Sequence, residues 1–259
     1  MKNFIKSMIM FFIGLTLLAG CASTNYNYFQ DGKPSGKNDG EGTMSFSVCS
    51  AVNYNIEDEL GKPPEIEIKE EIKAAPLAAI QGQIGATDYL DFGGSLGFTA
   101  ISINTRIFSK LCLLNKNQKL GIGLMPALNF SFVPDSLGCI DLPQSLSANF
   151  NFSVPISFDL SDNVTFVLRP NYASEWSRVY TTDNDTEKEY KKNFKYKSRG
   201  IAVGFKIKLK NSDKFIYPEI SFITYDKGVH YYPFIGIAFG AGGPDGFLGK
   251  DEEDDDTGL

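Results

Sequence analysis

Apolar and polar residues alternate along most of the chain, and turn residues interrupt the alternation at intervals. In the clearest stretch, SANFNFSVPISFDL at 147–160, every even position is apolar and every odd position is Ser, Asn, Pro or Asp. A period of two is the pattern of a β-strand with two different faces. Ten such segments predict antiparallel strands at about 43–54, 77–86, 90–98, 101–107, 119–133, 147–160, 164–181, 199–210, 215–225 and 229–239.

The connections between these strands differ in length. Short turns (TDY, SDN and NSDK) follow the second, sixth and eighth strands, whereas long connections at 55–76, 134–146 and 182–198 follow the first, fifth and seventh. Short turns at one end and long loops at the other are typical of bacterial outer-membrane barrels. The predicted fold is therefore all-β, an antiparallel up-and-down β-barrel of about ten strands. The count becomes eleven if 63–76 adds a strand rather than a short helix and nine if 90–109 is one strand; eight or twelve are possible with further changes.

The residues between the apolar positions indicate which face is outside. A solvent-facing sheet usually has Lys, Glu, Thr and Arg, but here the polar face is mostly small, as at Ser147, Asn149, Asn151 and Ser153. Small residues suit a narrow barrel lumen, where side chains from all strands converge. We therefore predict that the Phe face of 147–160 meets lipid. The alternative is a soluble β-sandwich whose large aromatic residues form the core.

Charges on the predicted inner face have both signs. A charge in such a lumen must be paired to offset its desolvation. We predict that Glu219 and Glu175 contact Arg169 or Arg106 in a structural network; the alternative is that the charges set ion selectivity in a pore. The predicted network comprises Asp91, Arg106, Arg169, Glu175, Lys206, Lys208 and Glu219. Aromatic residues on the opposite face, including Trp176 and Tyr180, gather near a long loop, as expected in the headgroup zone.

Residues 1–20 predict a secretion signal, with two lysines followed by an apolar run that is too short to span a membrane. The segment LLAGC resembles the bacterial lipoprotein signal, which implies cleavage before Cys21 and acylation of that cysteine. Ala22 follows where an aspartate would favour retention in the inner membrane, so the resemblance implies the outer membrane. The alternative is an ordinary signal peptide. Membrane lipid is the expected partner, through the Cys21 acyl chains and the apolar barrel face.

Composition predicts the segments that flank the barrel, which we place at 43–240. Residues 21–42 are rich in Asn, Gly, Ser and Asp and predict a flexible tether, and 241–259 contain the run DEEDDD and predict a disordered tail. Removal of Lys2 and Lys6 leaves 23 basic and 31 acidic residues, a net charge of −8, which argues against nucleic acid as a partner. Cys49, Cys112 and Cys139 allow at most one disulfide.

Two hairpin segments resemble bacterial outer-membrane β-barrel proteins. QIGATDYLDFGGSLGF at 83–98 is similar to a recurring hairpin of those proteins, and YPEISF at 217–222 is similar to a late strand with an inward glutamate. The last strand, PFIGIAFG, fits their C-terminal insertion signal through Gly236 and Phe239. It departs from that signal in lacking a terminal Phe.

Catalytic motifs are not found in the sequence. His230 is the only histidine, no serine lies in a GxSxG motif, and neither Gly-rich segment has the spacing of a phosphate loop. No Cys/His spacing indicates zinc, and no cofactor is expected. We predict a non-enzymatic, lipid-anchored outer-membrane barrel with a structural or surface-interaction role or a narrow pore. The alternatives are a periplasmic lipocalin-like lipoprotein that binds an apolar ligand and, more distantly, a lipid-modifying enzyme that uses His230.

Overall fold

The structure is a computed structural model that describes residues 22–24, 28–57, 65–99, 102–133, 136–137, 140–141, 144–182, 189–210, 212–225 and 232–243. Its strands are β1 (Ala22–Thr24), β2 (Gly40–Glu57), β3 (Glu65–Gly85), β4 (Leu90–Phe98), β5 (Ile103–Cys112), β6 (Leu120–Val133), β7 (Ser136–Leu137), β8 (Ile140–Asp141), β9 (Ser145–Ser153), β10 (Ile156–Ser161), β11 (Val164–Thr182), β12 (Glu189–Lys208), β13 (Lys214–Tyr225) and β14 (Tyr232–Gly243). Among the residues that the structure describes, no helix is long and apolar enough to cross a membrane.

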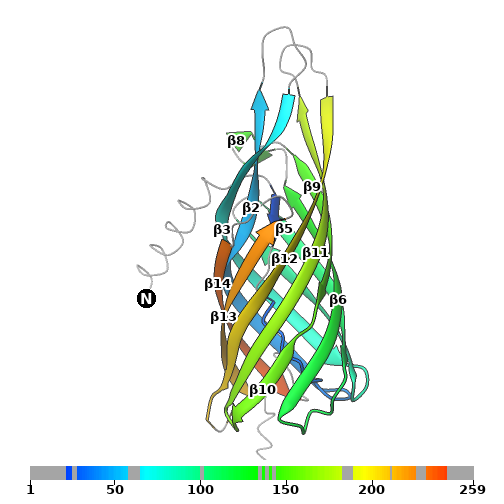
Figure 1. The fold of residues 1–259 in the computed structure, drawn as a ribbon, viewed down its shortest axis with the longest axis vertical. Coiled ribbons are helices and arrows are strands. Elements are labelled where there is room, and N and C mark those ends of the chain that lie inside the picture. Colours follow the sequence, from blue (N-terminus) through cyan, green and yellow to red (C-terminus); the bar gives the residue numbers. More distant parts are fainter. Residues whose placement is uncertain are drawn as a thin grey trace, which may run out of the picture.

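Strands β2 to β14, apart from β7 and β8, close into an antiparallel up-and-down barrel (Figure 1). β7 and β8 pair with each other in a separate two-stranded sheet. β9 and β10 form one barrel strand between β6 and β11, interrupted where Pro155 has no N–H to donate to the ladder. β14 pairs with β2, with Phe239 opposite Met44, and this pairing closes the barrel. The described residues thus form a barrel of ten strands plus the extra strand β1, which confirms the predicted fold.

The two ends of the barrel differ. We call the end with the connections 86–89 and 162–163 the turn end, and the end with the connections 58–64, 134–144 and 183–188 the loop end. Figure 1 shows the β2–β3 and β11–β12 hairpins extending beyond the neighbouring strands at the loop end.

Two predicted long loops are wrong over much of their length, because 65–76 belongs to β3 and 189–198 belongs to β12. These parts are rich in Lys and Glu. Apolar residues in these parts, such as Ile66, Ile68 and Phe194, are few and lie among charged ones, so their alternation is a weak strand signal. Backbone pairing nevertheless continues there, as at Tyr180 opposite Lys191.

The large apolar side chains point outward. Phe150 and Phe152 are exposed, whereas Ser147, Asn149, Asn151 and Ser153 are buried on the other face of β9. The same arrangement recurs around the barrel, with Ile80, Ile107, Leu128, Phe158, Ile201 and Ile235 among the exposed large apolar residues. A continuous apolar surface of this extent is unlike that of a soluble monomer. We call this surface the apolar belt.

Candidate functional site

The barrel lumen contains part of the protein's own N-terminal region. Tyr28, Phe29 and Gln30 are each at most 2% exposed and lie among lumen residues of several strands. We call residues 28–39 the plug. The sequence predicted a flexible tether at 21–42, but 28–36 is buried or half-buried in the barrel, Lys37 and Asn38 are exposed at its turn end, and 40–42 belongs to β2. The physical reason is that the polar groups of the plug are matched by lumen groups, as the following contacts show.

Tyr28 lies between two arginines of the barrel wall. The Arg106 guanidinium on β5 is 3.7 Å from the centre of the Tyr28 ring, and that of Arg169 on β11 is 4.7 Å away. The Tyr28 N–H donates to Glu219 Oε1 (3.1 Å), and the same oxygen accepts from Arg169 Nη2 (2.6 Å). Cation–π attraction and a shared carboxylate thus hold Tyr28 between opposite walls.

Phe29 occupies an apolar part of the lumen. Its ring meets the Tyr217 ring edge to face, with centroids 5.7 Å apart, and it packs in one cluster with Val167, Phe215, Tyr217 and Ala238. Burial of a phenylalanine side chain stabilises a fold by roughly 1.5–3 kcal/mol. Phe29 therefore provides an apolar anchor beside the charged contacts of Tyr28.

Asp31 pairs with two lysines of the wall. Lys206 Nζ donates to Asp31 Oδ2 (2.9 Å), and Lys110 Nζ lies 3.7 Å from Asp31 Oδ1. Lys110 also donates to the Lys33 carbonyl (2.7 Å) and lies 3.2 Å from Asp91. Because Lys110 and Asp91 are fully buried, their charges need this compensation.

The remainder of the plug contacts the wall near the turn end. Ser35 donates through its N–H (3.0 Å) and its hydroxyl (3.1 Å) to Asp91 Oδ2, and the Lys33 ammonium pairs with Asp159. Opposite charges therefore meet on both sides of the plug. Wall lysines face Asp31, and wall carboxylates face Lys33 and Ser35.

The plug reverses direction at the turn end to enter β2. Gly36 has a φ of 103°, in the left-handed region that glycine adopts without a steric penalty. Asn38 N donates to Gly85 O (2.9 Å), and Gly85 N donates to Asp39 O (2.9 Å). A side chain at Gly85 would collide with the Gly36 backbone. The two glycines thus permit the close approach that ties the plug to the end of β3, just before the chain enters β2.

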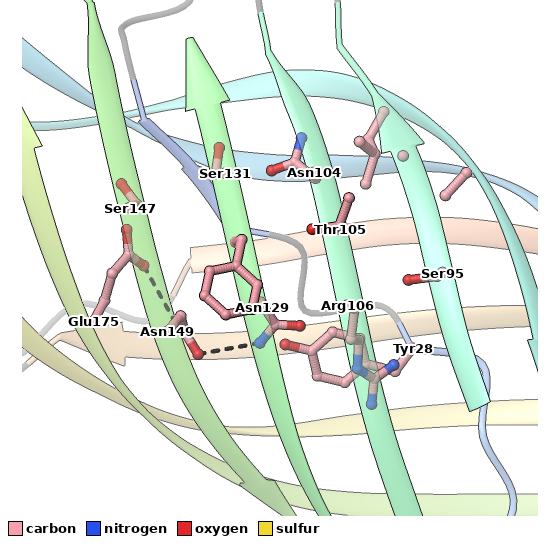
Figure 2. A pocket seen from close by; sticks show the side chains of 14 residues that line it. Tyr28, Ser95, Asn104, Thr105, Arg106, Asn129, Ser131, Ser147, Asn149 and Glu175 are labelled. Atoms are coloured by element: carbon pink, nitrogen blue, oxygen red, sulfur yellow. Dashed lines mark hydrogen bonds between the residues drawn. The ribbon is translucent and has the colours of Figure 1, made fainter. Parts of the chain in front are cut away.

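A small cavity remains on the loop-end side of Tyr28. Its volume is about 30 Å³, and it is lined by polar groups including Asn104, Asn129, Ser147 and Glu175. Figure 2 shows the chain of hydrogen bonds from Asn129 to Asn149 (3.2 Å) and from Asn149 to Glu175 (3.3 Å) beside Tyr28. A space of this size suits a water molecule, whereas ligand pockets begin at ~300 Å³.

A larger polar recess of about 390 Å³ opens at the turn end. Its lining includes Lys33 and Ser35 of the plug together with Glu41, Lys116, Asp159 and Lys208. The plug forms part of this lining, so the recess ends against it.

The seven residues of the predicted charge network lie as follows. Six are buried: Asp91, Arg106, Arg169, Glu175, Lys206 and Glu219. Lys208 is exposed and lies at the turn-end recess. Glu219 contacts Arg169, while Glu175 accepts hydrogen bonds from Asn149 and from the Tyr196 hydroxyl.

Sequence reasoning missed Asp31, Lys33, Lys110 and Asp159. Lys110 shares its face with Arg106 and Phe108, a signal that was lost because the predicted strand ended at 107. Asp31 and Lys33 follow two adjacent aromatic residues in a polar segment, and this Tyr-Phe pair is a weak sign of burial.

The remaining candidate residues are His230 and the four cysteines. His230, Cys21 and Cys139 lie outside the described residues, and Cys49 is described only through its backbone in β2. Cys112 is buried at the turn end with a free thiol. Among the described side chains, no group of three or more His, Cys, Asp or Glu is arranged to hold a metal ion.

No family model matches the chain, and no curated protein matches it. Among solved structures, Ail, the attachment invasion locus protein of Yersinia pestis, is 8% identical with a TM-score of 0.32, covering 80% of this chain and 97% of Ail. The outer membrane protease OmpT of Escherichia coli is 10% identical with a TM-score of 0.34, covering 79% and 91%.

The N-terminal β-barrel domain of Pseudomonas aeruginosa OprF is 12% identical with a TM-score of 0.29, covering 80% of this chain and 98% of that domain. By their names, the OprF domain is a β-barrel and OmpT is an outer membrane protease. At these identities and scores the likenesses carry no information about activity. The fold assignment rests on the strand pairing of the chain itself.

Proposed function

We propose that the protein is a non-enzymatic outer-membrane β-barrel, anchored by lipid at Cys21, whose lumen is closed by its own plug and whose role is structural or at the cell surface. The observation that carries this proposal is the combination of an outward apolar belt with a lumen occupied by residues 28–36 of the plug. The belt suits the hydrocarbon of a membrane. The plug argues against a permanently open pore.

The geometry disfavours the lipocalin-like alternative. A carrier for an apolar ligand needs an apolar cavity of ~300 Å³ or more. The described lumen is instead lined by Ser, Asn and paired charges, and the cavity beside Tyr28 measures about 30 Å³. For an enzyme that acts on lipid, the described residues supply no catalytic histidine, because the candidate His230 lies outside them.

The proposal predicts that Cys21→Ala leaves the protein in the membrane. The barrel belt holds it there independently of acylation, so the variant should still require detergent for extraction and should still migrate differently on a gel before and after heating. Metabolic labelling with a palmitate analogue should be lost in Cys21→Ala and retained in the control Cys49→Ala. Release of Cys21→Ala as a soluble protein would contradict the barrel, and equal labelling of both variants would contradict the anchor.

A further inference from the structure

The outer surface of β11 and β12 changes character toward the loop end. Nearer the turn end, β12 presents the exposed apolar residues Ile201, Phe205 and Ile207 to the outside. Further along the same face it presents basic residues, all exposed: Lys191, Lys195, Lys197 and Arg199. The apolar belt on this strand thus ends at a run of cations.

β11 supplies aromatic partners for these cations. Tyr172 lies opposite Arg199 in the strand pairing, Trp176 opposite Lys195, and Tyr180 opposite Lys191. Lys195 Nζ is 5.5 Å from the centre of the Trp176 ring. Arg178 adds a further exposed cation to the face and donates from Nε to Asn193 Oδ1 (2.8 Å). We call Arg178, Lys191, Lys195, Lys197 and Arg199 the basic face.

The neighbouring strand places the basic face at the edge of the apolar belt. On β9, Leu146 lies opposite Arg178, Ala148 opposite Trp176, and Phe150 opposite Ser174. Leu146 is 51% exposed, so the outer surface beside the cations is still apolar. Over 164–180 of β11 and 191–207 of β12, the outward side chains that the structure describes include no acid, although the whole chain has a net charge of −6. The cations are therefore gathered on one side of the barrel where acyl chains would give way to headgroups.

We propose that the basic face binds the phosphate groups of lipids in the membrane leaflet at the loop end. This inference rests on the proposed membrane function. Ammonium and guanidinium groups form charge-assisted hydrogen bonds with phosphate, and Trp and Tyr favour the same interfacial zone. The adjoining apolar residues of β9 and β12 would contact the acyl chains of the same lipid molecules. This continuity favours a lipid over a free phosphate or a protein as the occupant.

The test uses Trp176, which is the only tryptophan of the chain and lies beside the basic face. The detergent-solubilised protein is titrated with phosphatidic acid that carries brominated acyl chains, which quench tryptophan fluorescence on contact. The matched lipid is brominated diacylglycerol, which lacks the phosphate. We expect phosphatidic acid to quench Trp176 at about tenfold lower concentration, because several cations contribute to phosphate binding.

Matched variants separate the basic face from general electrostatics. The triple variant Lys195→Gln, Lys197→Gln, Arg199→Gln should lose the preference for phosphatidic acid. The control Lys208→Gln, Lys210→Gln, Lys214→Gln removes three exposed cations near the turn end and should keep it. Equal preference in both variants would overturn the proposal, as would full competition by inorganic phosphate. If both variants stay in the membrane fraction, the proposed membrane barrel stands even where the lipid-phosphate proposal fails.

Discussion

Replacing residues 28–37 with a glycine-serine segment of equal length is expected to convert a closed barrel into one that conducts ions. The change removes the Tyr28 and Phe29 rings from the lumen together with the Asp31 and Lys33 charges. A barrel of about eight strands is filled by its own side chains, and one of ten strands is wider. The structure fills that additional width with the plug, so its loss should leave a water-filled path.

Single-channel recording in planar bilayers tests this expectation. The unaltered protein should show no discrete conductance steps, and the plug variant should show them. A control with the same glycine-serine segment at 247–256, in the acidic tail, should behave like the unaltered protein. Conductance steps of equal size in all three proteins would show that the plug does not close the lumen.

Glu219→Ala is expected to destabilise the protein by about 3–5 kcal/mol, the cost of removing one partner of a buried ion pair. Glu219 and Arg169 have side chains at most 1% exposed and are joined by a contact of 2.6 Å. The substitution takes this carboxylate away from the buried Arg169 guanidinium. It also removes the acceptor for the Tyr28 N–H, so it weakens the wall and the plug together.

Urea unfolding of the protein in lipid vesicles measures the change. The control Asp213→Ala removes an exposed carboxylate at the turn before β13 and should alter stability by no more than about 0.5 kcal/mol. Glu219→Gln keeps an acceptor for Tyr28 but removes the charge, and should fall between the two. Equal stability of Glu219→Ala and Asp213→Ala would show that the Arg169–Glu219 pair contributes little to holding the barrel.

The charge network shows which features of a side chain the alternation of residues along a strand can predict. Arg169, Glu175 and Glu219 were assigned to one face by counting alternate positions, and all three are buried. Their partners could not be obtained in this way. Glu219 is 50 residues from Arg169 and 191 from Tyr28 in sequence. Strand periodicity fixes the direction of a side chain, whereas its partner depends on barrel closure.

The amino-acid pattern alone was sufficient to predict ten barrel strands and their apolar faces, although not the charged loop-end parts of β3 and β12, because side-chain direction in a strand depends only on alternate positions along the backbone. The small residues Ser147, Asn149, Asn151 and Ser153 also indicated correctly that the Phe face is outside. The position of residues 28–39 could not be obtained without the three-dimensional fold. Their composition resembles a linker, and Asp31 acquires its ion-pair partners only because the closed barrel brings Lys110 and Lys206 to it from β5 and β12.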